Sequence, residues 1–310
     1  MENAQEKVTD TRSSISTLTG FLMSLHARFG PAGVPPLFRL MKITVSDVPK
    51  LLREEGLDAF EYEAVHWGKK PQLRREEAEK LNLEAKQRDV WVSLHGSYFL
   101  NFSGSRSIVA DSKQRLIACA TAAEWMGAHT VVFHPGVYGK RPPEVAFKMC
   151  SDALREVVET MRNLGIVNVR LGPETMGRTY QLGSLDEVIS LCERVEQTQM
   201  VVDWAHLHAR GLGRFRKVDD FRKVVELIES RLGTEAARNL HCHFSKIEYS
   251  DKGERRHHTL EEPRYGPDFR MLARVIVEFN MSPIVISESP MQDADAIRMR
   301  DTLKDELEKT

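Results

Sequence analysis

The sequence predicts an α/β protein built as a single (β/α)8 barrel. Short apolar segments alternate with amphipathic helical segments eight times over about 280 residues, which is the length of one such barrel. Most of the apolar segments end in a histidine, aspartate or glutamate, and no linker divides the chain. A doubly wound open sheet is the competing fold, but it gathers its ligands at one switch point, whereas a barrel brings all strand ends to one mouth.

The strands and helices follow from apolar runs, capping residues and glycine punctuation. The strands are expected at residues 26–29, 59–65, 92–95, 131–134, 169–174, 200–203, 240–244 and 283–288, and the first is expected to end in a turn at residues 30–33. The helices are expected at about residues 46–56, 72–87, 111–127, 143–165, 185–195, 218–232 and 267–279, and from about residue 291 onward. Ser184 and Glu187 form a capping box, and Asp111 with Ser112 is expected to start the third helix.

Composition and charge limit the class of protein and its expected compartment. The chain has 310 residues, 41% of them apolar, and a net charge of -1, so no global charge points to nucleic acid. No apolar run approaches the length of a membrane span. Residues 1–22 are polar and lack the apolar core of a signal peptide, so we expect a flexible N-terminal extension before a barrel at residues 23–310. The four cysteines have no metal-type or disulfide-type spacing, and a cytoplasmic protein is expected.

The strand ends predict a metal site. An unpaired charge at the end of a buried strand is costly, and a divalent ion is a partner that suits imidazole and carboxylate alike. Ligands without thiolate favour zinc, with manganese as the alternative, and their number suffices for two or three ions. The candidates include both histidines of the seventh strand and two residues of the loop that follows it. They are His95, His134, Glu174, Asp203, His206, His241, His243, Glu254, His257 and Glu288.

Basic residues lie in the loops that follow the second, sixth and seventh strands. These loops are expected on the same face as the metal site, so that a nearly neutral protein still presents positive charge to phosphates. The residues are Lys69, Lys70, Arg210, Arg214, Arg216, Lys246 and Arg255.

The candidate ligands and the residues next to them together resemble the endonuclease IV family, and in particular its divergent archaeal and bacterial branch. Members of this family are zinc-dependent apurinic/apyrimidinic endonucleases on a xylose isomerase-like TIM barrel. The similarity spans about residues 27–290. The matching stretches are His95-Gly-Ser-Tyr-Phe-Leu-Asn, His134-Pro-Gly, Pro173-Glu174-Thr-Met-Gly, Asp203-Trp-Ala-His206, His243-Phe-Ser, His257-His258-Thr-Leu and Ile286-Ser-Glu288.

The resemblance implies three metal sets and a reaction. One zinc would be held by His95, His134 and Glu174, a second by Glu174, Asp203, Glu288 and a histidine of the seventh strand, and a third by His206, His257 and a carboxylate. The implied reaction is base excision repair of double-stranded DNA: a metal-bridged hydroxide, positioned by Glu174, hydrolyses the phosphodiester 5′ to an abasic site. Tyr98 and Phe99 would insert into the duplex at the lesion, and a monomer is the family expectation.

Two features depart from the family pattern, and one rival function remains. His241 and His243 share a strand face, and we favour His243 because it lies nearer the mouth. Arg255 stands where the family has an aspartate, so either Glu254 becomes the ligand or the third site is weak. The rival is a sugar isomerase or epimerase of the same superfamily, with one metal on Glu174, Asp203, Glu288 and a histidine of the seventh strand.

Overall fold

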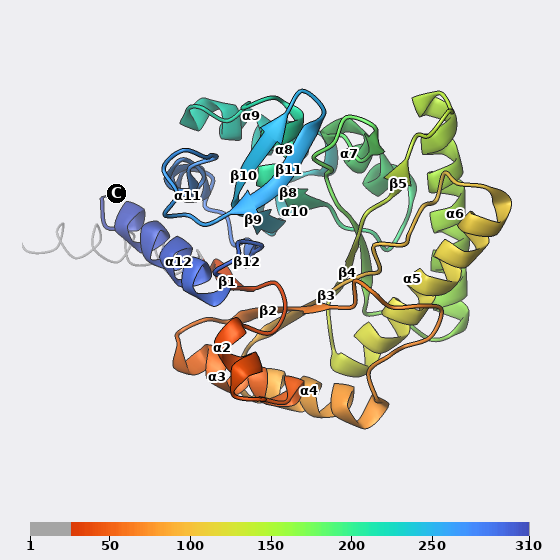
Figure 1. Ribbon diagram of the computed structural model, residues 1–310, viewed down its shortest axis with the longest axis horizontal. Helices are drawn as coiled ribbons and strands as arrows, with labels where there is room; N and C mark the ends of the chain where they lie inside the picture. Colours follow the sequence, from red (N-terminus) through yellow and green to blue (C-terminus); the bar gives the residue numbers. More distant parts are fainter. Residues whose placement is uncertain (1–25, 310) are drawn as a thin grey trace, which may run out of the picture.

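The computed structural model describes residues 26–309, and eight parallel strands in this part of the chain form a closed barrel. They pair as two four-stranded sheets, in the orders β1-β12-β9-β8 and β2-β3-β4-β6. Backbone hydrogen bonds close both seams, from Gly33 N–H to Glu61 O at 2.8 Å and from Thr175 N–H to Val201 O at 3.2 Å. Helices surround the strands (Figure 1), so the expected (β/α)8 barrel is confirmed.

All eight expected strands are present. They are β1 (Arg28–Pro31), β2 (Ala59–Glu63), β3 (Trp91–His95), β4 (Thr130–Phe133), β6 (Arg170–Pro173), β8 (Val201–Asp203), β9 (His241–Phe244) and β12 (Ile284–Ser287). The expected turn at residues 30–33 was wrong, because Gly30 and Pro31 continue β1 and pair with β12. Glycine is needed in this strand, since a Cβ on Gly30 would lie 1.7 Å from the carbonyl oxygen of Ala59 on β2.

The expected helices are also present, with one start misplaced. They are α3 (Val48–Glu54), α4 (Arg75–Gln87), α5 (Arg106–Met126), α6 (Pro143–Asn163), α7 (Leu185–Arg194), α9 (Val218–Leu232), α11 (Phe269–Glu278) and α12 (Asp293–Leu307). The capping box of Ser184 and Glu187 is confirmed. Helix α5 starts at Arg106, five residues before Asp111, because Ser105 caps it and the Ser112 hydroxyl donates to a carbonyl within the helix.

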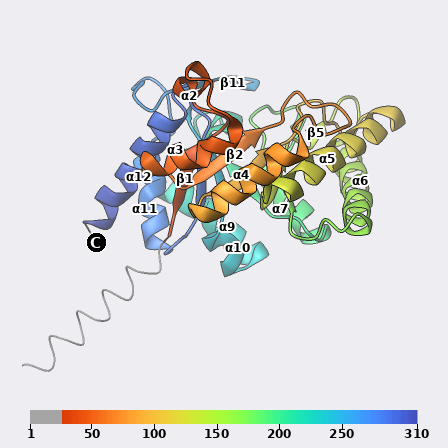
Figure 2. The same cartoon turned by 90° about the horizontal axis from the view of Figure 1, so that it is seen from below.

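Several short elements replace expected loops, and all of them except the short helix directly before β9 lie at the barrel mouth. They are α2 (Pro36–Leu40), the 3-10 turn η1 (Val45–Asp47), α8 (Trp204–Arg210), α10 (Thr234–Arg238), the small pair β5 (Gly136–Val137) and β7 (Gln181–Leu182), and the hairpin β10 (Lys246–Ser250) and β11 (Gly253–His258). The hairpin and α2 lie on the same side of the barrel, as Figure 2 shows. The chain after β8 and after β9 was therefore wrongly expected to be loop.

The barrel interior is layered by the period of two along each strand. A lower layer is apolar and contains Ala59, Trp91 and Ile284. The next positions toward the mouth carry polar groups, among them Glu61, which pairs in register with Ser93. Within residues 26–309, no helix is long and apolar enough to cross a membrane. The expected extension at residues 1–22 lies outside the described part of the chain.

Candidate metal centre

Histidine, aspartate and glutamate side chains from the strand ends meet at the mouth of the barrel. The described residues contain five overlapping groups in which all candidate ligand atoms lie within 4.8 Å of one another, and three of these are sets made only of residues that the sequence singled out. The three sets are His95, His134 and Glu174; Glu174, Asp203, His243 and Glu288; and His206, His257 and Glu288. The other two groups include Glu61, once with His241 and His243 and once with His95 and Glu288. The structure thus brings together eight of the ten candidate ligands, in groupings close to those implied by the resemblance.

Glu174 lies at the middle of these sets. Its Oε2 is 3.0 Å from Nε2 of His134 and 3.4 Å from Nε2 of His95, and its Oε1 is 3.3 Å from Nδ1 of His243. Two ligands of one tetrahedral zinc are about 3.4 Å apart, given bonds of about 2.0–2.1 Å. Both oxygens are buried without a hydrogen bond, so each is free to meet an ion on its own side.

Backbone carbonyls set the direction of two histidines. Nδ1 of His95 lies 3.0 Å from the carbonyl oxygen of Gly96, and Nδ1 of His206 lies 3.0 Å from that of Thr175. A carbonyl oxygen only accepts, so each Nδ1 carries the hydrogen and each Nε2 presents its lone pair. The orphaned Nε2 of His95 faces Glu174. Such outer hydrogen bonds are how proteins orient metal-binding imidazoles.

The two carboxylate oxygens of Asp203 have different surroundings, one at the start of a helix and one in the metal centre. Oδ1 accepts from the backbone N–H of His206 at 2.6 Å and so caps α8, while Oδ2 is buried without a hydrogen-bond partner. Burial raises the pKa of Asp203 well above its usual range; His206 opposes the shift and the nearby Glu288 and Glu174 charges add to it. A divalent cation would supply the missing partner, and the imidazole and carboxylate donors fit zinc or manganese.

The third set depends on the hairpin. Strand β11 carries His257 to the mouth, where it joins His206 and Glu288. A bulge between Glu248 and Tyr249 shifts the pairing. Oε2 of Glu254 lies 3.4 Å from Nε2 of His206, but Glu254 is not part of the set that His206 forms with His257 and Glu288.

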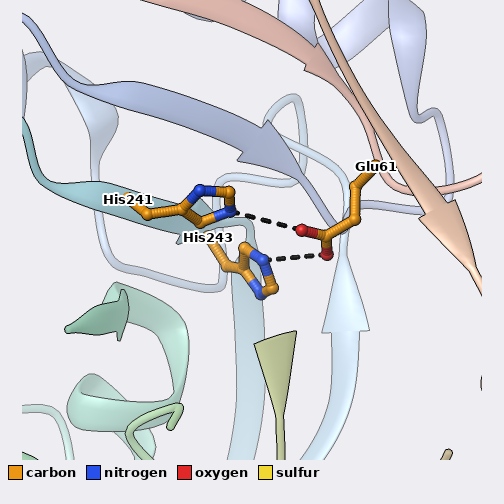
Figure 3. Close-up of side chains that lie close together, drawn as sticks. All are labelled: Glu61, His241 and His243. Atoms are coloured by element: carbon orange, nitrogen blue, oxygen red, sulfur yellow. Dashed lines mark hydrogen bonds and ion pairs between the residues drawn. The ribbon is translucent and has the colours of Figure 1, made fainter. Parts of the chain in front are cut away.

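His241 does not join these sets. It lies two residues deeper than His243 on the same face of β9, and its Nε2 is 3.2 Å from Oε2 of Glu61 (Figure 3). The geometry thus favours His243 as the ligand of this strand. Glu61 was not among the residues that the sequence singled out, although a carboxylate within an expected barrel strand is a signal of the same kind as the others.

The residues expected to contact DNA divide into free and engaged side chains. Tyr98 and Phe99 are 49% and 56% exposed, and the ring of Tyr98 stacks on His134 with centroids 5.3 Å apart. Lys70 and Arg214 are exposed as well.

Other basic residues are committed to protein partners. Arg210 donates to the carbonyl oxygens of Arg178 at 2.7 Å and Gln181 at 3.1 Å, because α8 aims it back at the preceding loop. The structure therefore gives Arg210 a structural role and not the expected free cation. The remaining four each have a protein contact: Lys69 with Asp111, Lys246 with the Glu262 carbonyl, Arg255 with Glu248, and the exposed Arg216 with the Gly213 carbonyl.

Comparison of the sequence with known proteins assigns the chain to a family. The family model described as xylose isomerase-like TIM barrel matches residues 49–308. An uncharacterized protein of Methanocaldococcus jannaschii is 34% identical over 87% of this chain and 94% of its own length. A probable endonuclease 4 of Geobacillus is 26% identical, over 64% of this chain and 69% of its own.

Solved structures agree in fold. Endonuclease IV of Thermus thermophilus has a TM-score of 0.65 at 19% identity, covering 86% of this chain and 95% of that one. A D-tagatose 3-epimerase-like protein has a TM-score of 0.63 at 17% identity, covering 91% and 97%. At these identities the structural likeness shows the fold alone, and the family is shown by the sequence model and the archaeal relative. The chain belongs to the xylose isomerase-like TIM barrel family.

Proposed function

We propose that this protein is a metal-dependent endonuclease that hydrolyses the phosphodiester 5′ to abasic sites in double-stranded DNA, as a step of base excision repair. The observation that carries the proposal is the sharing of ligands: Glu174 belongs to two of the three sets and Glu288 to two. Shared carboxylates would hold two or three zinc ions side by side, which suits displacement at a phosphodiester. The probable endonucleases 4 among the relatives support this choice.

Different residues of the chain would bind the ions and align the reacting groups. Bound divalent ions would supply a nucleophile at neutral pH and offset charge on the phosphate. His95, His134, Asp203 and His243 would hold those ions in place, and the buried Glu174 would fix their separation and align the reacting groups between them. Manganese is the alternative ion because the donor set is the same.

The surface around the mouth would meet the duplex. Tyr98 and Phe99 project beside the centre, where large exposed rings are suited to wedge into the base stack and open it at a missing base. Exposed Lys70, Arg214 and Arg216 would neutralise phosphates nearby. We infer a monomer that works in the cytoplasm, consistent with four cysteines that form no disulfide.

The test is incision of a duplex oligonucleotide that carries one abasic analogue, before and after zinc is stripped and restored. We expect site-specific incision that disappears on stripping and returns with zinc. His134→Ala should abolish incision, whereas His129→Ala should not, because these histidines flank opposite ends of the same strand β4. No incision under any divalent metal would refute the proposal.

A sugar isomerase or epimerase is the second candidate, because Glu174, Asp203, His243 and Glu288 by themselves form a complete four-ligand set. In that case one ion would suffice, and His206 and His257 would contact substrate or pack. The number of zinc ions per chain distinguishes the two: one favours the isomerase, and two or three favour the nuclease. Epimerisation of a ketose with one bound ion would decide for the sugar enzyme.

A further inference from the structure

A buried group of three polar side chains surrounds Glu61 one layer beneath the metal centre. The Ser93 hydroxyl donates to Oε2 of Glu61 at 2.7 Å, and Nε2 of His241 lies 3.2 Å from the same oxygen. Nε2 of His243 lies 3.0 Å from the other oxygen, Oε1. Figure 3 shows both imidazoles of β9 directed at the carboxylate, which comes from β2. Glu61, Ser93, His241 and His243 are all fully buried.

His243 therefore has two different faces. Its Nδ1 lies 3.1 Å from Oε1 of Glu288 and 3.3 Å from Oε1 of Glu174, in the set proposed to hold an ion. Its Nε2 points the other way, at Glu61. A neutral imidazole carries one ring hydrogen, so a lone pair on Nδ1 requires the hydrogen on Nε2, the nitrogen that lies 3.0 Å from Oε1 of Glu61. The contact is an ion pair by distance, and neither of its two atoms has another hydrogen-bond partner.

Two other histidines of the centre, His95 and His206, are oriented differently. His95 and His206 donate from Nδ1 to the neutral backbone carbonyls of Gly96 and Thr175 and present Nε2 to the site. His243 presents the opposite nitrogen and meets a full negative charge on its far side. A carboxylate behind a metal-binding imidazole fixes the ring and makes it a stronger donor than a carbonyl does.

We propose that Glu61 is a positioning residue for the metal centre: it holds His243 with Nδ1 toward Glu174 and Glu288, and is itself held by Ser93 and His241. The assignment rests on the metal centre of the proposed function and is independent of the substrate. It also gives His241 a role, as a side chain that fills one side of Oε2 and leaves Oε1 for His243.

Two competing arrangements make Glu61 itself a ligand, because its candidate ligand atoms lie within 4.8 Å of those of His241 and His243 and also of those of His95 and Glu288. An ion in the first set would require His243 to give Nε2 to that ion and Nδ1 to the centre, and thus to lose both ring hydrogens. An ion in the second set would place a Glu61 oxygen at bonding distance in a zinc-loaded structure. As polar contacts around one carboxylate, two hydrogen bonds and one ion pair, the same distances require no ring to lose both hydrogens. The positioning role is therefore the simpler account of the geometry.

The test is a zinc titration against a competing chromophoric chelator, which needs no substrate. Glu61→Gln keeps an acceptor oxygen without the charge, and Glu61→Ala removes both. We expect the Kd of one ion to rise by about 10-fold to 100-fold, more in the alanine variant, with an unchanged number of ions at saturation. If Glu61→Ala fails to fold, the nearly isosteric Glu61→Gln still gives the answer. With an active substrate, kcat should fall with little change in KM.

The control is Asp295→Asn, which changes another fully buried carboxylate, one that accepts from the Leu260 N–H at 2.9 Å and pairs with Arg298. It should lower the melting temperature and leave zinc affinity unchanged. Glu61 variants that behave in the same way would overturn the positioning role. A zinc-loaded crystal structure with a Glu61 oxygen about 2.0–2.2 Å from an ion would also overturn it. Failure to cut abasic DNA with normal zinc binding would refute the proposed function alone.

Discussion

Zinc should stabilise this fold strongly, and Glu174→Gln should remove most of that effect. In the metal-free protein both oxygens of Glu174 and Oδ2 of Asp203 are buried without hydrogen-bond partners, so the folded state has unsatisfied groups that the unfolded chain gives to water. Ions that bind only the folded state raise its stability by mass action. Because Glu174 belongs to two sets, one substitution should weaken two sites.

The rise in melting temperature (Tm) that zinc should cause follows from the free energy of binding and the entropy of unfolding. One ion at a free concentration about 1,000 times its Kd contributes about 4.1 kcal/mol. With 310 residues and an unfolding entropy of about 2.1 cal/mol/K per residue, the total is about 0.65 kcal/mol/K, so each ion raises Tm by about 6 °C. Two ions should therefore raise Tm by about 13 °C, and a third by about 6 °C more.

Scanning calorimetry at buffered free zinc measures this directly. Glu174→Gln should keep at most the shift of the third set, about 6 °C. His206→Ala should lose only that part, and Asp295→Asn should start from a lower Tm and keep the whole shift. An undiminished zinc response in Glu174→Gln would refute the reasoning, because the shared carboxylate would then bind no ion.

Three further outcomes are expected. Tyr98→Ala should weaken binding to abasic duplex more than hydrolysis of a small phosphodiester; equal losses would argue against a wedge. Gly30→Ala places a Cβ 1.7 Å from the backbone oxygen of Ala59 and should cost more than about 3 kcal/mol in urea unfolding, whereas Gly68→Ala should be near neutral. Burial and two nearby cations lower the pKa of His129, so its folded form resists protonation. The contribution of His129 to the stability of the metal-free protein should therefore fall as pH falls from about 7 to about 5, so the free energy of unfolding of His129→Asn should decrease less over this range than that of the wild type; identical slopes would contradict this.

The strand ends were predictable because their signal is local. An apolar run that stops at His95 or Asp203 indicates, within a few adjacent residues, both the strand and the polar group at its end. A barrel brings such strand ends together regardless of the conformation of its loops. Even the common face of His241 and His243 follows from the period of two. The preference for His243 also followed from the sequence, because His243 lies nearer the C-terminal end of the strand, whereas the partner of His241, Glu61, did not.

Glu61 and Arg210 show where local reasoning stops. Glu61 meets His241 across 180 positions of sequence and from another strand, so its partner is visible only after the barrel has closed. Arg210 has the composition of a phosphate-binding loop, but the cap that Asp203 gives α8 turns this segment into a helix and directs the guanidinium to backbone carbonyls. A charge count along the chain cannot distinguish these cases.

The buried group around Glu61 should contribute little to the free energy of unfolding of the metal-free protein. Burying a carboxylate with two imidazoles removes all of them from water, and apolar replacement of such groups often leaves a protein as stable or more stable by about 1–4 kcal/mol. If the group exists to position His243, then Glu61→Leu combined with Ser93→Ala and His241→Leu should leave the metal-free barrel at least as stable in urea while zinc affinity falls. The joint change matters, because Glu61→Leu alone leaves the buried Ser93 and His241 without their partner. A loss of several kcal/mol in the triple variant, with zinc affinity intact, would instead make the group a structural support of the fold.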